Sequence, residues 1–251
     1  MAWSFRPALW SVIGTVAGCA LTVHLGLWQV HRGLDKQALD RQYAEAAQKP
    51  PLELTAATAP LATMAATSVS AHGEYLADRQ LLLDDQVHGE TTGYEVWTPL
   101  RLADGHLLIV NRGWIPLGAS RHELPPVPAP SGPVSLNGLW RSLPEPGIRL
   151  GGAGCDVAHP PSQWPRPVLY PTAADLACFY GEPVLAGEVL LAPGAADGFV
   201  REWRVGSAGF PPARHYAYAA QWFAFALTLL VLFIKLNLKR KPHTRSPDDK
   251  P

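Results

Sequence analysis

The chain has 251 residues, of which 47% are apolar and 17% charged, with 21 basic and 21 acidic side chains. This length suits one globular domain or two small ones. A balanced charge argues against a general nucleic-acid-binding protein, because such domains are usually strongly basic, and the apolar fraction argues against a disordered chain.

The first predicted element is a transmembrane helix over residues 8–30. No Lys, Arg, Asp or Glu occurs between Arg6 and Arg32, and a helix of about 20 mostly apolar residues crosses a bilayer. A lipoprotein signal cleaved before Cys19 and an ordinary signal peptide are the two alternatives. The apolar run continues well past that cysteine, which disfavours both of them.

The residues between the two apolar segments, 31–214, are predicted to form one β-rich domain. Residues 94–102 place apolar side chains on one face, the dipeptide Asp104-Gly105 is typical of a tight turn, and residues 106–112 return as the second strand of a hairpin. Pro99 indicates an edge position or a bulge in the first of these strands. Further strands are expected over residues 79–84, 134–141, 184–191 and 199–205.

One short helix is predicted over residues 173–180. Thr172 and Asp175 have the spacing of a capping box, and Gly181 follows the last helical residue. Several short strands with one helix favour a small, mainly antiparallel sheet, curled or barrel-like, over a parallel α/β domain.

Two stretches rich in Pro and Gly, residues 124–133 and 143–171, are expected to be irregular loops. Cys155 and Cys178 both fall in the β-rich domain, where an oxidising compartment would allow a disulfide. The sequence leaves open whether they pair, and it assigns no role to the loop over 143–171. Cys155 with His159 is too small a donor set for a metal site.

The last predicted element is a second transmembrane helix over residues 215–234. This segment lies between Arg214 and Lys235 and contains no charged residue. It has the length and composition that a bilayer-spanning helix needs. The chain therefore has an apolar helix on each side of the β-rich domain.

The distribution of charge predicts the orientation of the chain in the membrane. Residues 235–251 carry 6 basic and 2 acidic side chains, a net charge of +4, whereas residues 32–214 carry 14 basic and 19 acidic ones, a net charge of −5. Basic segments beside a membrane span stay in the cytoplasm. Both termini are therefore expected in the cytoplasm and the β-rich domain outside it. Residues 1–7 leave no room for a mitochondrial transit peptide, so we expect a bacterial inner membrane and a periplasmic domain.

No catalytic pattern is present in the sequence, which has no Gly-rich phosphate loop, nucleophile elbow or His-Glu-x-x-His zinc motif. We therefore expect that the protein is not an enzyme. Polar side chains at the ends of the two spans are more informative, because polar groups in a membrane are costly and often functional. Those expected at one level of the membrane are Trp28, Gln29 and His31 on the first helix, and His215, Tyr218, Gln221 and Trp222 on the second.

Three of these residues, His215, Tyr218 and Trp222, share one helix face through i, i+3, i+7 spacing. A neutral imidazole beside large aromatic rings suits a porphyrin, with His215 as the axial ligand of the iron. The alternative is that the Trp and Tyr side chains are ordinary interfacial anchors and that a His is tolerated at a helix end. The residues by themselves leave both interpretations open.

Within the spans, small residues and one further histidine bear on packing. Gly14 with Gly18, and Ala220 with Ala224, have the small-xxx-small spacing of closely packed membrane helices. His24 lies deeper in the first segment, where an unpaired imidazole is costly. We expect this side chain to be packed and hydrogen-bonded.

Four segments, in the same order along the chain, resemble the Surfeit locus protein 1 family. They are Leu25-Gly-Leu-Trp-Gln29 followed by Arg32 and Lys36; Gly73-Glu-Tyr75 with Gly93-Tyr-Glu-Val-Trp-Thr-Pro-Leu100; Leu108-Ile-Val-Asn-Arg-Gly-Trp-Ile-Pro116; and His215-x-x-Tyr-Ala-x-Gln-Trp-Phe223. They extend over nearly the whole chain, with an apolar helix at each end.

This resemblance implies a membrane-anchored assembly factor for cytochrome c oxidase that helps haem a reach subunit I. It implies that His215 is the ligand of the haem iron. The other residues expected at the cofactor are Trp28, Gln29, Tyr218 and Trp222. The motif residues without an assigned role are Arg32, Arg112, Trp114 and Gln221. As an alternative to a functional role, residues 111–114 simply end the second strand of the hairpin.

The expected partners are subunit I of the oxidase, haem a synthase and the lipid bilayer, with no nucleic acid. The alternative function is a cofactor-free membrane scaffold that stabilises oxidase assembly intermediates. A periplasmic enzyme such as a hydrolase is a third hypothesis, and the lack of a nucleophile–base motif counts against it.

Overall fold

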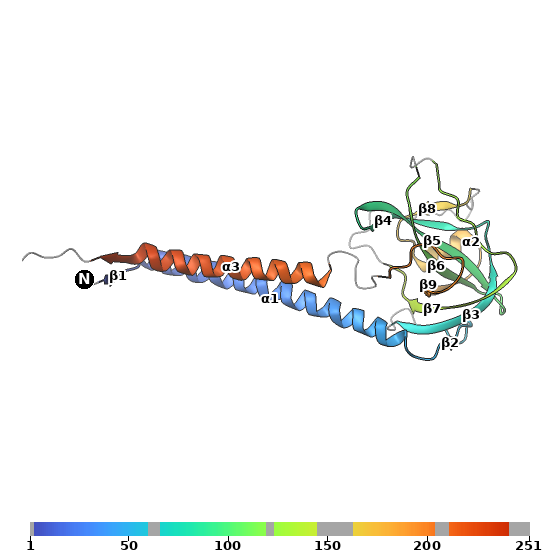
Figure 1. Ribbon diagram of the computed structural model, residues 1–251, viewed down its shortest axis with the longest axis horizontal. Coiled ribbons are helices and arrows are strands. Elements are labelled where there is room, and N and C mark those ends of the chain that lie inside the picture. The colour runs from blue at the N-terminus through green and yellow to red at the C-terminus, as the bar shows by residue number, and fades with distance from the viewer. Residues whose placement is uncertain (1–2, 60–65, 119–122, 145–162, 204–210, 241–251) are drawn as a thin grey trace, which may run out of the picture. The chain divides into compact units, whose positions relative to one another are not determined.

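The computed structural model describes residues 3–59, 66–118, 123–144, 163–203 and 211–240. The chain divides into two compact units, residues 1–40 with 205–251, and residues 41–204. The first unit contains two long helices, and the second contains a mainly antiparallel sheet with a short helix (Figure 1).

The two long helices, α1 (Leu9–Ala46) and α3 (Pro212–Asn237), have 38 and 26 residues. By length and composition, both are able to cross a membrane. α1 is longer than the predicted span, which ends at residue 30. The sequence after residue 33 contains good helix formers and neither Pro nor Gly up to Ala46, so the helix continues where the apolar run has ended. Short strands β1 (Trp3–Phe5) and β10 (Leu238–Arg240) pair antiparallel.

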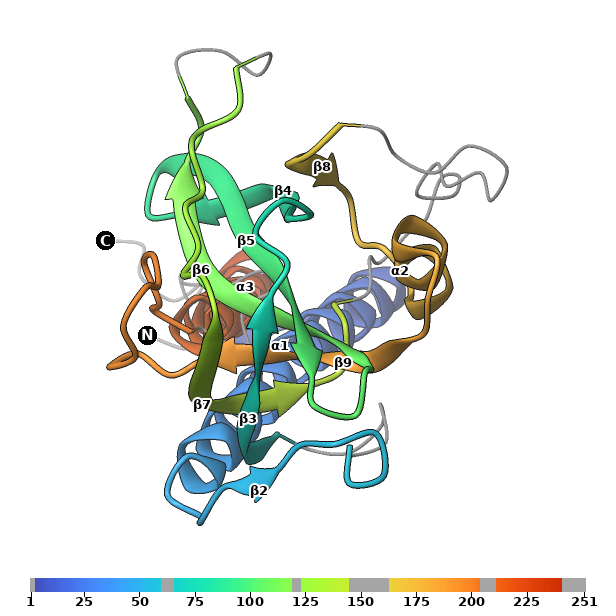
Figure 2. The same cartoon turned by 90° about the vertical axis from the view of Figure 1, so that its right-hand side faces the viewer.

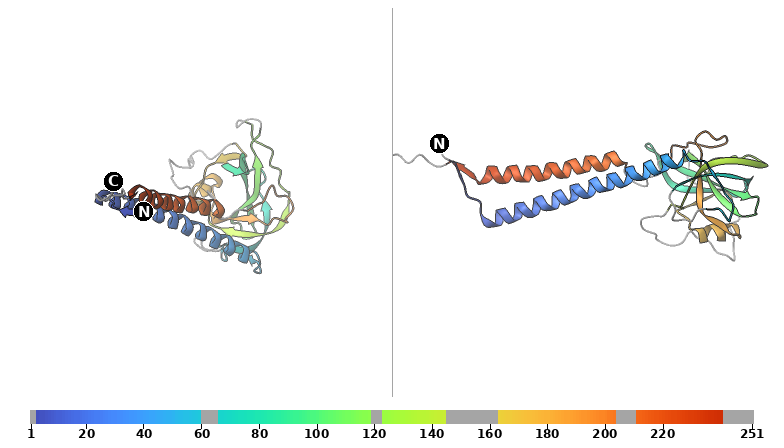
Figure 3. Two further views of the ribbon diagram at one scale, coloured as in Figure 1. Left: turned by 60° about the vertical axis from the view of Figure 1, so that its left-hand side comes forward. Right: turned by 90° about the horizontal axis from the view of Figure 1, so that it is seen from below.

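α1 and α3 lie side by side, and glycines on α1 allow the close approach (Figures 1 and 3). A Cβ atom added to Gly26 would lie 2.5 Å from the ring of Phe223, and one added to Gly33 would lie 2.7 Å from the ring of Tyr216. Gly18 faces Leu229. Of the predicted pair, therefore, Gly18 packs against α3, whereas a Cβ at Gly14 would meet no described atom within 4 Å.

His24 is exposed, and in the described part of the chain it has no hydrogen-bond partner. The expectation that it is packed and hydrogen-bonded is therefore wrong. Thr22 and Gly26 are the buried positions on this stretch of α1. Successive residues of a helix are about 100° apart around its axis. Thr22 and Gly26 are on the side of α1 that faces α3, so His24, midway between them in the sequence, points away from α3.

The sheet has the strand order β2-β3-β7-β9-β6-β5-β4-β8, with an additional pairing between β3 and β5. Its strands are β2 (Leu52–Glu53), β3 (Thr67–Tyr75), β4 (Leu81–His88), β5 (Thr91–Leu102), β6 (Leu107–Pro116), β7 (Pro133–Arg141), β8 (Arg166–Val168) and β9 (Val184–Leu191). Most pairings are antiparallel, as predicted, while β2–β3, β4–β8 and β6–β9 are parallel. The β3–β5 pairing completes a circuit through β3, β7, β9, β6 and β5, which Figure 2 shows.

Most of the predicted strands are confirmed, and one is wrong. β7 and β9 match residues 134–141 and 184–191 to within one residue, and the hairpin forms as β5 and β6 around Gly105, whose φ is +87°. Residues 199–203 do not form a strand, because only Val200 makes a bridge, to Trp114. The side chains of Arg201 and Trp203 instead donate to the carbonyls of Ala192 and Leu191.

Pro99 lies in an interior strand, so the predicted edge position is wrong; the register shift of the β5–β6 pairing lies between Glu95 and Trp97, and Pro99 itself is in register with Ile109. On one side β5 pairs with β6, and on the other it pairs first with β4, up to Leu81–Trp97, and then with β3, from Tyr75–Leu100. Pro99 occupies the gap between these two partners, and its carbonyl accepts a bond from the Leu76 amide at 2.9 Å. A residue without an N–H is tolerated here because neither neighbouring strand needs a donor from it.

The core of the second unit follows the predicted period-two pattern of β5. Leu100 and Leu102 belong to the largest buried cluster, which also contains Val110 and Trp140. Tyr94 and Val96, which have the same parity, pack in an adjacent cluster. On the opposite face of β5, Trp97 packs in a third cluster against the short helix α2 (Ala173–Tyr180).

α2 has the predicted caps. The Thr172 side chain accepts from the Asp175 amide and the Asp175 carboxylate accepts from the Thr172 amide, while Gly181 adopts the left-handed conformation at the end. Cys178, on this helix, is disulfide-bonded. Cys155 and His159 lie outside the described residues.

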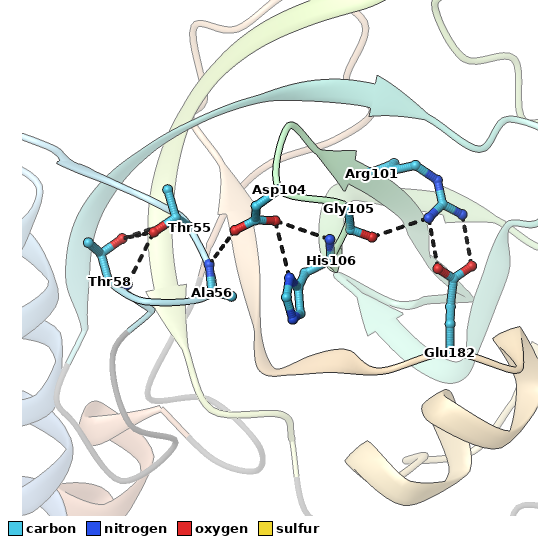
Figure 4. A network of polar contacts seen from close by, with 8 residues as sticks. All are labelled: Thr55, Ala56, Thr58, Arg101, Asp104, Gly105, His106 and Glu182. Atoms are coloured by element: carbon cyan, nitrogen blue, oxygen red, sulfur yellow. Dashed lines mark hydrogen bonds and ion pairs between the residues drawn. The ribbon is translucent and has the colours of Figure 1, made fainter.

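The β5–β6 turn is tied to two distant segments by polar contacts (Figure 4). The Asp104 carboxylate accepts from the Ala56 amide at 2.7 Å and from the His106 amide at 3.1 Å. Arg101 donates to both oxygens of Glu182, just after α2, at 2.7 and 2.8 Å. The Ala56 amide lowers the pKa of Asp104, and the Arg101 guanidinium lowers the pKa of Glu182. These contacts fix the hairpin tip.

Candidate functional site

Two residues of the predicted cofactor group meet where α1 and α3 are packed together. Nδ1 of His215, in the first turn of α3, donates to Oε1 of Gln29 on α1 at 2.7 Å. His215 is only 8% exposed and Gln29 is partly buried. When Nδ1 carries the proton, the lone pair of the neutral imidazole is on Nε2, so this contact selects one tautomer.

The local sequence explains why His215 occupies this position. Pro211 has extended backbone angles and Pro212 is the first residue of α3, a place where the missing N–H of proline costs nothing. His215 and Ala219, one turn apart, are the two buried residues of α3. Gly33 faces the ring of Tyr216, which allows the helices to approach at this level.

The aromatic residues predicted at the cofactor lie around this contact with different exposures. Trp28 is 50% and Tyr218 37% exposed, whereas Trp222 is partly buried and packs edge-to-face on Phe225 with ring centroids 5.8 Å apart. Gln221 is exposed. The residues at i, i+3 and i+7 therefore do not share one environment as expected. His215 faces α1, whereas Tyr218 lies on the outer surface of the helix pair.

The predicted motif residues of the sheet have structural contacts. Arg112 on β6 is 2% exposed and donates to the carbonyls of Pro128, at 2.9 Å, and Asp197. Its guanidinium lies over the rings of Tyr75 and Phe199, at 5.4 and 5.2 Å from their centroids. Burial lowers the pKa of Arg112. This side chain therefore holds two loops against the sheet.

Trp114 is also a structural residue of the sheet. Its indole N–H donates to the Gln86 carbonyl at 2.9 Å, and its ring centroid lies 5.1 Å from that of His88. Its backbone forms the bridge to Val200. Trp114 thus joins the end of β4 to the segment that follows β9. Residues 111–114 do not end the hairpin strand, because β6 continues to Pro116.

A buried polar network crosses four neighbouring strands and was not anticipated from the sequence. Asn111 on β6 donates to Glu95 on β5 at 2.7 Å and to Glu188 on β9 at 3.1 Å, and Arg141 on β7 donates to Glu188 at 2.6 Å. Glu188 is fully buried. Burial raises its pKa to about 7, against the attraction of Arg141. A lone acidic residue inside the apolar run of β9 is the signal that sequence reading passed over.

The described residues contain no cluster of side chains that could ligate a bare metal ion. Among residues 3–240, less the undescribed gaps, no group of three or more His, Cys, Asp or Glu side chains could hold one. A single imidazole with its tautomer fixed instead suits an iron that brings its own four equatorial nitrogens, as in a haem. A histidine whose Nδ1 is held by a hydrogen bond in this way has the arrangement of one that ligates a metal through Nε2.

A family model for the SURF1 family matches residues 16–227. The chain belongs to the SURF1 family. All four sequence segments that resemble this family lie within the matched region. A SURF1-like protein of Monosiga brevicollis is 30% identical to the chain over 132 residues, which are 48% of the chain and 51% of that relative. The chain thus matches the curated relative over about half of the relative's length. The SURF1 match includes both the Gln29–His215 contact and the buried Arg112 of the sheet.

Proposed function

We propose that this SURF1 protein is a membrane-anchored assembly factor for cytochrome c oxidase that binds haem a and assists its insertion into subunit I. Family membership and two apolar helices support a membrane role in oxidase assembly. In this proposal the helices are spans over residues 8–30 and 215–234 of a bacterial inner membrane, with residues 1–7 and 235–251 in the cytoplasm. The barrel-like sheet domain, within residues 31–214, is periplasmic.

The hydrogen bond between Gln29 and His215 is the observation that carries the haem role. His215 binds the iron through Nε2, and Gln29 orients the imidazole and keeps the proton on Nδ1. Trp28, Tyr218 and Trp222 supply apolar rings beside the macrocycle. Haem, when bound, would supply an iron that can accept a nitrogen ligand from the protein.

In this proposal the sheet domain docks on the partner proteins and is not catalytic. Its buried charged residues, Arg112 and the pair Arg141–Glu188, are engaged in contacts that hold strands and loops together. The proposed partners are oxidase subunit I and haem a synthase, both reached from the membrane.

The test is to coexpress the chain with the enzymes of haem a biosynthesis and to record the absorption spectrum of the purified protein. We expect haem in the wild type and at least a tenfold lower haem content in His215→Ala, since losing the iron ligand removes more than about 1.4 kcal/mol of binding free energy. His24→Ala, which removes an exposed imidazole of α1, is the matched control and should keep its haem. Equal haem in wild type and His215→Ala would show that the ligand assignment is wrong.

The alternative function is a cofactor-free scaffold that stabilises oxidase assembly intermediates. The low exposure of His215, 8%, favours this alternative, because an imidazole that is mainly packed between helices also serves as a structural residue. A scaffold would be colourless when purified from the same cells and would still copurify with subunit I.

A further inference from the structure

Two cations follow the Gln29–His215 contact along α1. Arg32 and Lys36 are four residues apart and so share one helix face. They lie three and seven residues after Gln29, which corresponds to about 4.5 Å and about 10 Å along the helix axis. As the i+3 and i+7 positions, they lie on the same face of α1 as Gln29, whose side chain contacts His215. The imidazole therefore has positive charge on the side where the apolar segment ends.

The two cations also act on each other. Arg32 is exposed and, within the described residues, forms no ion pair with a carboxylate. Burial first, and then the charge of Arg32, lower the pKa of Lys36. Like charges four residues apart destabilise a helix. Asp40 offsets part of this repulsion at Lys36. An anion placed beside both side chains would offset more of it.

We infer that Arg32 and Lys36 bind the carboxylate groups of the ligand whose iron is held by His215. This inference rests on the proposed haem role. The ligand class is a flat apolar macrocycle with carboxylates along one edge: the macrocycle lies against the apolar helices, and the carboxylates extend toward the polar end of α1. Arg32 suits a carboxylate because its guanidinium donates two parallel hydrogen bonds, and Lys36 adds a second positive charge.

The experiment compares two probes that differ only at the carboxylates, iron protoporphyrin IX and its dimethyl ester. Each is titrated into the detergent-solubilised full chain, and Kd is taken from the absorption change. We expect the wild type to bind the free acid at least tenfold more tightly than the ester. Arg32→Gln with Lys36→Gln should bind both probes equally, with the absorption spectrum of the bound iron unchanged.

Two further variants control for folding and for general charge. Arg41→Gln removes another exposed cation of α1 and should keep the preference for the free acid. Arg32→Lys with Lys36→Arg conserves both positive charges and should keep most of the preference for the free acid. If the Gln variant also loses affinity for the ester, the two cations act through the fold and the inference is wrong.

The remaining outcomes separate the inference from the function on which it rests. If the wild type binds neither probe, or if binding is unchanged in His215→Ala, the haem role itself is wrong. If binding depends on His215 but the wild type takes acid and ester equally, the inference falls and the haem role stands. In nanodiscs, loss of the preference with phosphatidylglycerol but not with phosphatidylcholine would assign the cations to lipid phosphates and overturn the inference.

Discussion

Replacing Glu188 by Gln tests how the buried network of the sheet is balanced. Glu188 is fully buried and accepts hydrogen bonds from Asn111 and Arg141. Its pKa is raised from 4.5 to about 7, mainly by burial, with Arg141 acting in the opposite direction. Gln has nearly the same shape but stays uncharged at every pH, so the substitution removes the cost of ionising this buried group.

The sign of the pH dependence follows from the two pKa values. Between pH 4.5 and about 7 the unfolded chain binds fewer protons at Glu188 than the folded chain does, so the free energy of unfolding falls as pH rises through this window. The shift of about 2.5 pKa units corresponds to about 3 kcal/mol. We therefore expect Glu188→Gln to match the wild type at pH 5 and to be more stable by about 2–3 kcal/mol at pH 8.

The assay is urea unfolding of the detergent-solubilised chain, followed by the fluorescence of Trp97 and Trp140, both fully buried in the sheet unit. Glu90→Gln makes the same chemical change at an exposed turn and should leave the pH dependence unaltered. A Glu188→Gln protein less stable than the wild type at pH 8 would refute the reasoning. In that case the attraction between Glu188 and Arg141 would exceed the cost of burying the carboxylate.

Two other substitutions test contacts within each unit. Gly26→Leu places a side chain where the ring of Phe223 lies and should weaken the helix pair by about 1–3 kcal/mol. Maleimide labelling of Cys19, partly buried beside α3, should become faster, whereas Gly14→Leu, at an open position, should not change it. Arg112→Met removes two hydrogen bonds to loop carbonyls and should lower the free energy of unfolding by about 2–4 kcal/mol; an unchanged urea midpoint would contradict the structural role.

Elements with a strong local signal could be predicted from the sequence. β9 is an apolar run that contains one charged residue, Glu188, and α2 has both caps in its sequence. β3 was missed because its buried residues, Val69, Ala71 and Tyr75, alternate with mostly small or polar ones and give a weak pattern. The segment 199–203 has the sequence pattern of a strand. In the part of the structure that is described it forms only one bridge, between Val200 and Trp114, and so it does not become a strand.

The candidate site was predictable as a set of residues and not as a set of contacts. The ends of the two apolar runs place Gln29 and His215 at one level, and the structure joins them by a hydrogen bond. The side of each helix that is buried depends on the glycines of α1 that face α3. The spacing of residues in the sequence could therefore not predict whether His24 and Tyr218 are buried or exposed. The Glu188 network depends on strand order, since Arg141 and Asn111 become its neighbours only when β9 lies between β7 and β6.

The position of β9 has a consequence for how the chain folds during its synthesis. β9 pairs with both β6 and β7, yet residues 184–191 are made after every other strand of the sheet. Until they emerge, the edges of β6 and β7 that face β9 have unpaired backbone groups, and such edges favour aggregation. A nascent chain that stops before residue 191 therefore cannot complete its sheet, and the sheet closes only shortly before α3 is made.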